Sequence, residues 1–106
     1  MGGALKVFHD YEGRSIRLTD ERWDHIQEHP EMYRSLSDIG RILLHPEQVV
    51  QSRADGEARL YYRYIFGSPV GDKYLCVVVK IRSHDAFVLT AYYTDTIKRG
   101  PRLWPK

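Results

Sequence analysis

Two histidines, His25 and His29, stand four residues apart in a segment with helical periodicity. On a helix this spacing places both side chains on one face. Because histidine titrates nearest neutral pH, either could act as a general acid or base, and a structural histidine with a local hydrogen bond is the alternative for each. Zinc hydrolases share this spacing, but no glutamate follows His25 and no third ligand suggests itself, so we predict no metal and no organic cofactor.

Several cations fall within segments that alternate like β-strands, namely Arg53, Arg59, Arg63 and Lys80. A strand holds its side chains in fixed directions, so such a cation could contact a phosphate with little loss of entropy. Lys80 lies between Val79 and Ile81 in an apolar segment, and burying it without a partner would be costly. We predict a functional role for Lys80, with a side chain that simply reaches solvent at the sheet edge as the alternative.

Hydroxyl-bearing side chains alternate along one later segment, at Thr90, Tyr92 and Thr94. Such hydroxyls can hydrogen-bond to phosphate or ribose, and tyrosine rings can stack on unpaired bases. Each of these residues is also a good strand former, which is the simpler explanation for any one of them alone. Their coincidence with Lys80 on one face of a hairpin is what favours a functional role.

The hairpin that would position these groups has two strands, 73–82 and 86–94, joined by a short polar turn. If Arg82 pairs with Ala86, side chains alternate between two faces. The first face, predicted to seat the helices, carries Leu75, Val77, Val79, Ile81, Phe87, Leu89, Ala91 and Tyr93. The second face, where we expect chemistry, carries Tyr74, Cys76, Val78, Lys80, Val88, Thr90, Tyr92 and Thr94. Arg63 joins the second face in one register, whereas a slip by one residue brings Tyr62 and Tyr64 there instead.

Local signals predict the remaining elements. Alternating segments at 5–8 and 15–18 suggest a small hairpin, and Thr19 is a candidate N-cap for a helix that ends near Glu28. A capping-box-like pattern at Ser35 begins a second helix, which Pro46 stops. Strands at 48–53 and 59–66 precede the hairpin, and a basic tail follows it. We predict one α+β domain over residues 1–106, with two N-terminal helices packed on a four-stranded antiparallel meander sheet.

Composition favours a cytoplasmic protein with an anionic partner. Among the 106 residues, 1–47 carry nine acids and six bases, whereas 48–106 carry five acids and ten bases. A phosphate-bearing partner would explain this, and random scatter of surface charge is the alternative. No apolar stretch approaches the ~20 residues of a membrane helix, no signal peptide is recognisable, and the lone Cys76 cannot form an internal disulfide, so we expect no membrane partner. Residues 1–4 are expected to be disordered or vector-derived.

Five segments in order, IRLTDERWDHIQEHPEM, LHPEQVVQSR, LYYRY, KYLCVVVK and FVLTAYYTDTIKRG, resemble the phage-associated branch of the barnase–EndoU–colicin–RelE-like nuclease superfamily. The resemblance covers about residues 16–104 and implies two N-terminal helices on a four-stranded antiparallel sheet. It also implies metal-independent RNA cleavage in a cleft on the sheet. Members use varied sets of His, Lys or Arg, and Ser, Thr or Tyr. The matching positions here are His25 or His29, Arg63 or Lys80, and Thr90 or Tyr92.

We therefore predict an endoribonuclease of toxin or effector type that cleaves tRNA, rRNA or mRNA through attack of the ribose 2′-OH on the adjacent phosphate. A cognate antitoxin or immunity protein would be a further partner. The alternatives are a non-catalytic RNA- or protein-binding module of the same fold, and a metal-assisted hydrolase built on the two histidines. The predicted catalytic residues are His25, His29, Lys80, Thr90 and Tyr92, and the predicted RNA contacts are Arg53, Arg63, Tyr62 and Thr94.

Overall fold

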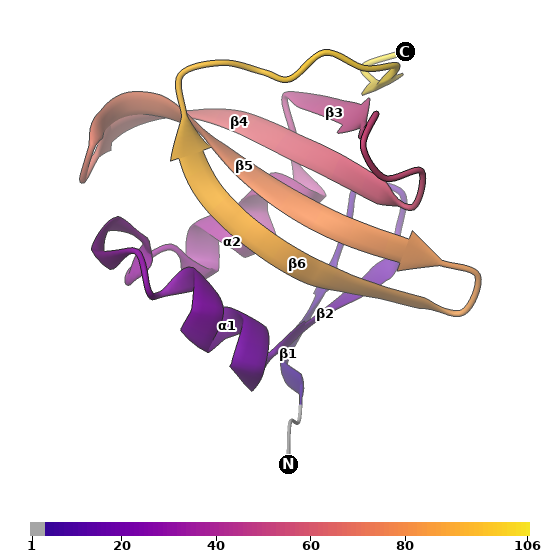
Figure 1. Cartoon of the computed structure of the whole chain (residues 1–106), viewed down its shortest axis with the longest axis horizontal. Helices are drawn as coiled ribbons and strands as arrows, with labels where there is room; N and C mark the ends of the chain where they lie inside the picture. The colour runs from indigo at the N-terminus through magenta and orange to yellow at the C-terminus, as the bar shows by residue number, and fades with distance from the viewer. Residues whose placement is uncertain (1–3) are drawn as a thin grey trace.

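One mixed β-sheet with two α-helices makes up the fold in the computed structural model, which describes residues 4–106 (Figure 1). The spatial order of the strands is β1-β2-β6-β5-β4-β3-β7. No helix within the described residues is long and apolar enough to cross a membrane. The elements are β1 (Ala4–His9), β2 (Ser15–Thr19), α1 (Asp20–Ile26), α2 (Leu36–Leu44), β3 (Gln48–Gln51), β4 (Ala58–Ser68), β5 (Gly71–Arg82), β6 (Asp85–Thr94) and β7 (Arg102–Trp104), with a 3-10 turn at Pro30–Met32.

The predicted fold of two N-terminal helices on a four-stranded antiparallel sheet is wrong. The meander β3–β4–β5–β6 is present, but it forms the centre of a seven-stranded sheet within the described residues. The N-terminal hairpin β1–β2 precedes the helices and joins β6 through a parallel contact between Arg17 and Phe87. The segment predicted as a basic tail adds β7 beside β3. Both additions depend on contacts between segments that are distant in the chain. The alternation of apolar and polar residues within a segment does not show which other segment it pairs with.

The predicted bounds of the two helices are confirmed except at the end of α1, and α2 ends at Leu44, before Pro46, as predicted. Thr19 is the N-cap of α1, and its Oγ1 accepts a hydrogen bond from the Arg22 N–H at 3.2 Å. The helix ends at Ile26 rather than near Glu28. Ser35 is the N-cap of α2, but the predicted capping box is wrong because its hydroxyl donates to the Met32 carbonyl at 2.6 Å. Of residues 1–4, Ala4 begins β1 and the rest lie outside the described residues.

Both helices cover the same face of the sheet and enclose the main core. The helix α1 packs on β6 and β2, and α2 packs on β1, β4 and β5. The face of β5 that was predicted to seat the helices does so, since Leu75, Val77 and Val79 are fully buried there. The buried members of this core are Phe8, Ile16, Leu18, Ile26, Met32, Ile39, Ile42, Leu43, Val49, Tyr61, Leu75, Val77, Val79, Ala86, Val88 and Ala91.

A β-bulge changes the register of the β5–β6 hairpin. Far from the turn the predicted pairing is confirmed, because Val78 lies opposite Thr90. Near the turn it is wrong: Arg82 pairs with Asp85 rather than Ala86, and the register shifts between Val78 and Val79. The extra residue on β6 is Leu89. As a result, the helix-facing residues of this half are Ala86 and Val88, not Phe87 and Leu89.

Candidate functional site

The sheet surface opposite the helices, here called the open face, brings together most of the predicted hydroxyl groups. Three side chains form one row across the sheet, because Cys76 lies opposite Tyr62 on one side and Tyr92 on the other. The next row pairs Val78 with Thr90. The slip by one residue considered for β4 is the register that occurs. The open face of β4–β6 carries Ala58, Leu60, Tyr62, Tyr64, Tyr74, Cys76, Val78, Lys80, Phe87, Thr90, Tyr92 and Thr94.

The central row of the open face remains protonated at neutral pH. Burial raises the pKa of Tyr62 to about 12 and that of the Cys76 thiol to about 11. Burial also raises the pKa of Tyr92, and the neighbouring thiol adds to this effect. Neither phenol can therefore serve as a base near pH 7. Tyr92 is half-buried and can donate a hydrogen bond to a bound anion, whereas Tyr62 is fully buried.

The segment 95–101, here called the C-terminal strap, runs from the end of β6 across to β7 at the far edge of the sheet (Figure 1). Its Ile97 packs on the apolar cluster of the open face. The Lys98 N–H donates to the Tyr62 hydroxyl at 3.1 Å, and the charge of Lys98 favours the thiolate of Cys76. Lys98 is thus a cation beside the central row, and our sequence candidates did not include it. The only signal for it was the basic character of residues 96–106.

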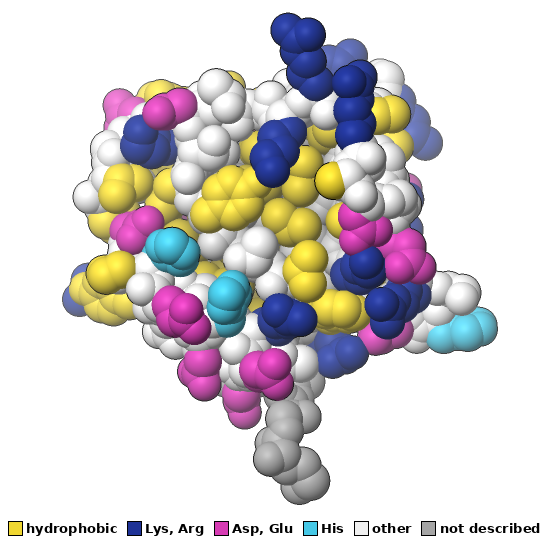
Figure 2. Space-filling view, viewed as in Figure 1, with side chains coloured by type: hydrophobic (Ala, Val, Ile, Leu, Met, Phe, Trp, Pro, Cys, Tyr) yellow, Lys and Arg dark blue, Asp and Glu magenta, His cyan; other side chains and the backbone are white. Residues whose placement is uncertain are grey.

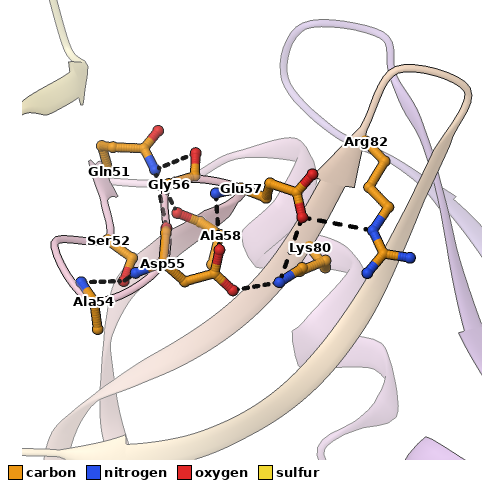
Figure 3. Close-up of polar contacts among 9 residues, drawn as sticks. All are labelled: Gln51, Ser52, Ala54, Asp55, Gly56, Glu57, Ala58, Lys80 and Arg82. Carbon is orange, nitrogen blue, oxygen red and sulfur yellow. Dashed lines mark hydrogen bonds and ion pairs between the residues drawn. The ribbon is translucent and has the colours of Figure 1, made fainter.

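Lys80 points from the open face toward the β3–β4 turn and is ion-paired there (Figure 3). Its Nζ contacts a carboxylate oxygen of Asp55 and lies 3.5 Å from Oε1 of Glu57. The hydrogen bond that Lys80 donates to the Asp55 carboxylate raises the pKa of Lys80 and lowers the pKa of Asp55. The Nε atom of Arg82 lies 3.6 Å from the same Oε1 atom of Glu57. Two carboxylates therefore balance these two cations, and a phosphate would have to displace them to reach Lys80.

Both histidine candidates lie at the surface of the molecule, in or just after α1. Both His25 and His29 are exposed, and the Nδ1 atom of His25 lies 3.6 Å from Oε2 of Glu28. His25 belongs to α1, which packs along β6, whereas His29 follows the end of this helix and precedes the 3-10 turn. The prediction that one helix face carries both histidines is therefore wrong, because the helix ends before it reaches His29. Figure 2 shows histidine side chains over α1 on the same side of the molecule as the apolar surface of the sheet. A histidine of α1 can thus border the open face without passing through the core.

Other predicted RNA contacts are spread more widely. Arg63 lies opposite Leu75, which faces the helices, so Arg63 is on the far side of the sheet and donates to the His45 carbonyl at 2.9 Å. Arg53 is exposed in the turn after β3. Thr94 is at the end of β6, where its hydroxyl exchanges hydrogen bonds with the backbone of Thr96 at 3.2 and 3.3 Å.

The comparison with protein families decides the class of this chain. The family PBECR2, described as phage-Barnase-EndoU-ColicinE5/D-RelE like nuclease2, matches residues 1–104. The chain belongs to this nuclease family. No curated protein and no solved structure gave a significant match. The resemblance noted from the five sequence segments is thereby confirmed, and it extends over nearly the whole chain.

For a PBECR2 nuclease, the open face offers donors for a phosphate but few free charges. Thr90 and Tyr92 are half-buried and lie in adjacent rows, whereas Tyr62 is fully buried and its hydroxyl accepts the hydrogen bond from the Lys98 N–H. Within residues 4–106, no group of three or more His, Cys, Asp or Glu side chains is arranged to hold a metal ion. The histidine candidates therefore lie in and just after α1, whereas the hydroxyl groups and Lys98 lie on the sheet and the strap.

Proposed function

We propose that this PBECR2 nuclease is a metal-independent endoribonuclease of toxin or effector type. Family membership supports a nucleic acid substrate, and the excess of bases in residues 48–106 supports binding of a polyanion. The observation that carries the proposal is the central row of the open face, where Tyr92 is half-buried and Lys98 of the strap lies beside Tyr62, on a sheet whose strand β6 packs against α1.

The acid–base roles follow from the protonation states of these side chains. Since the phenols of Tyr62 and Tyr92 stay protonated at neutral pH, the base among the candidates is His25 or His29. This base removes the proton of a ribose 2′-OH, and the oxygen attacks the adjacent phosphorus. The bond from phosphorus to the 5′ oxygen then breaks, which leaves a 2′,3′-cyclic phosphate. The departing oxygen takes its proton from the other histidine or from Tyr92.

The charge that develops on the phosphoryl oxygens needs donors fixed in place, and such stabilisation is usually the largest catalytic contribution. We assign this role to Lys98 and to the hydroxyls of Thr90 and Tyr92. Lys80 would contribute once a phosphate replaces the carboxylates of Asp55 and Glu57. Arg53 and Thr94 would contact the strand on either side, whereas Arg63 is too far round the sheet to act at this phosphate.

The proposal is tested by incubating the purified protein with tRNA, rRNA or mRNA in excess EDTA. We expect fragments that end in 2′,3′-cyclic phosphate. The double variant His25→Ala/His29→Ala should cleave about 10²–10⁴-fold more slowly, since it lacks the proton-transfer groups. The matched control is His84→Ala, an exposed histidine in the β5–β6 turn, which should cleave at the wild-type rate. Intact RNA in the presence of protein that is folded by circular dichroism would contradict the proposal.

The ion pairs of Lys80 favour one second candidate, a non-catalytic RNA-binding module, because a cation already held by Asp55 and Glu57 is poorly placed for catalysis. The same double histidine variant separates the two functions. In an enzyme it removes cleavage at unchanged fold, whereas in a binding module it alters affinity only.

The toxin role is tested in bacterial cells. Induced expression of the wild-type chain should arrest growth, and expression of the double histidine variant should not. A cognate antitoxin would be recognised as a co-expressed protein that restores growth and binds the purified nuclease. Normal growth with abundant folded wild-type protein would remove the toxin role while leaving RNA cleavage to be judged by the assay above.

A further inference from the structure

The bases of residues 48–106 fall into two groups that differ in their ion pairs. Four of the ten, Arg59, Lys73, Lys80 and Arg82, form ion pairs with acidic side chains. Residues 96–106 carry four bases and no acid, and none of these bases forms an ion pair with an acidic side chain of residues 4–106. Most of the unpaired positive charge of residues 48–106 therefore lies on the C-terminal strap and β7.

The strap holds its charges in place beside the open face. The Lys98 N–H donates to the Tyr62 hydroxyl at 3.1 Å, and the Gln51 N–H donates to the Pro101 carbonyl at 2.8 Å. The segment between these two hydrogen bonds is thus fixed to β4 at one end and to β3 at the other. Arg99 lies within this segment and is exposed. A cation on a backbone that is already fixed loses less entropy when it binds a phosphate.

Two further arginines extend this line of charge. Arg102 is exposed and lies opposite Val50, a buried residue of the apolar cluster on the open face. Arg53 is exposed and follows Gln51, to which the strap is hydrogen-bonded, by two residues. Figure 2 shows basic side chains along the upper edge of the molecule, where Figure 1 places the strap, with no acidic side chain among them. These cations, here called the basic track, are Arg53, Lys98, Arg99 and Arg102.

The basic track has the chemistry and the length of a site for the backbone of a polyanion. The four steps from Lys98 to Arg102 span at most about 14 Å of chain, so their side chains can reach successive phosphates of one strand. The guanidinium group matches the geometry of a phosphate with two parallel hydrogen bonds. Proteins that bind single strands without sequence preference use such a basic surface to follow the backbone. Because Lys98 also lies beside the central row, the track leads away from the proposed cleavage site.

We propose that the basic track binds the phosphate backbone of the RNA strand on one side of the cleaved bond. The inference rests on the proposed function, because it takes RNA as the substrate, and it assigns the path of the strand from the central row over the strap toward β7. Arg53, Arg99 and Arg102 bind phosphates and take no part in bond cleavage. Such contacts carry no sequence information, so they raise affinity for all RNA sequences alike and depend on salt.

The test measures how the affinity for a fluorescent 2′-O-methyl oligoribonucleotide changes with salt, by anisotropy. This strand lacks the attacking hydroxyl, so it binds without being cleaved. Each phosphate contact with a single strand contributes about 0.7 to the slope of log affinity against log salt, so Arg99→Gln/Arg102→Gln should lower the slope by about 1.4. When salt falls from about 200 to about 50 mM, wild-type binding should therefore strengthen about sevenfold more than binding of this variant.

The matched control is Arg34→Gln/Arg41→Gln, which removes the same charge from two exposed arginines at the start and in the middle of α2. Its slope should equal that of the wild type, because a change in net charge alone removes no phosphate contact. Arg53→Gln should lower the slope by about 0.7. Since Arg53 lies outside the strap, this variant tests the track even if the strap substitutions disturb the fold.

The outcomes separate the basic track from the nuclease mechanism. Equal slopes for Arg99→Gln/Arg102→Gln and its control would overturn the track, even if the wild type cleaves RNA. Binding to phosphatidylserine vesicles that is lost in this variant at an unchanged RNA slope would also overturn it, by assigning the strap to a membrane surface. A lowered slope in a protein that cleaves no RNA would support the track and overturn the nuclease mechanism alone.

Discussion

A buried carboxylate, Asp10, organises the turn between β1 and β2. Its side chain is fully buried and accepts four hydrogen bonds, from the N–H groups of Glu12 and Arg14 at 3.0 and 2.9 Å, from the Arg14 guanidinium at 2.7 Å and from the Tyr61 hydroxyl at 2.7 Å. A carboxylate is tolerated in the interior only when it is paired and hydrogen-bonded in this way. Asp10 therefore fastens the N-terminal hairpin to β4 in the middle of the sheet.

We expect Asp10→Ala to lower the free energy of unfolding by about 3–5 kcal/mol, because it leaves the buried Tyr61 hydroxyl and the turn N–H groups without their acceptor. Tyr61→Phe should cost less, about 1–3 kcal/mol, since three of the four donors remain. Urea denaturation followed by tryptophan fluorescence measures both. Tyr33→Phe removes a hydroxyl from an exposed ring and should change stability by less than about 0.5 kcal/mol. A cost of Tyr61→Phe equal to that of Asp10→Ala would contradict this account.

Close packing between α2 and β1 requires a glycine. A Cβ atom at position 40 would lie 2.7 Å from two ring carbons of Phe8, which is below any normal contact distance. Glycine in a helix interior costs about 1 kcal/mol relative to alanine, so its presence at Gly40 needs a packing reason. The contact with Phe8 provides that reason and sets how closely the helix approaches the sheet.

Gly40→Ala is therefore expected to destabilise the protein by about 1–3 kcal/mol, because overpacking outweighs the gain in helix propensity. Thermal unfolding of Gly40→Ala, Phe8→Leu and the double variant measures the effect. The double variant should lose less stability than the sum of the single variants, since Phe8→Leu removes the ring that clashes. Ser37→Ala, on the exposed side of the same helix, is the control. If the stability loss of the double variant equalled the sum of the two single losses, positions 40 and 8 would not be in contact.

The C-terminal strap crosses the molecule from the end of β6 to β7, which is the strand at one edge of the sheet (Figure 1). The strap docks closely at Gly100, where a Cβ atom would lie 2.3 Å from the Gln51 carbonyl oxygen and 2.9 Å from a Val50 methyl group. The Gln51 N–H donates to the Pro101 carbonyl at 2.8 Å. Backbone cannot yield as a flexible side chain does, so a larger residue here must displace the strap.

Gly100→Ala should uncover the central row and speed the reaction of Cys76 with a thiol reagent at neutral pH. Cys76 is the single cysteine and is fully buried, so its labelling rate reports opening of the strap. Overpacking of about 1–3 kcal/mol would raise that rate roughly 5- to 150-fold. Gly56→Ala, where an added Cβ meets no atom within 4 Å, should label at the wild-type rate. Equal labelling of Gly100→Ala and wild type would mean that the strap does not protect the thiol.

Local sequence determined the elements whose signals lie within a turn or a strand. Thr19 capped its helix as predicted, and the alternating segments after Pro46 became β3, β4, β5 and β6 in meander order. The family was also readable, because several short segments in one order resemble one nuclease superfamily and the family match spans residues 1–104. These features depend on neighbouring residues, and the chain sequence specifies them directly.

Tertiary structure decided what joins distant segments. The parallel contact of Arg17 with Phe87 and the pairing of β7 with β3 enlarged the sheet, and no periodicity in either segment reports its partner. The bulge at Leu89 moved Phe87 to the open face, because a strand can gain one residue without any change in its composition. Lys80 was located correctly, yet its ion pair with Asp55 depends on a turn 25 residues earlier in the chain. Which cations remain free for a substrate was therefore a property of the folded molecule, since ion pairing depends on distance in space.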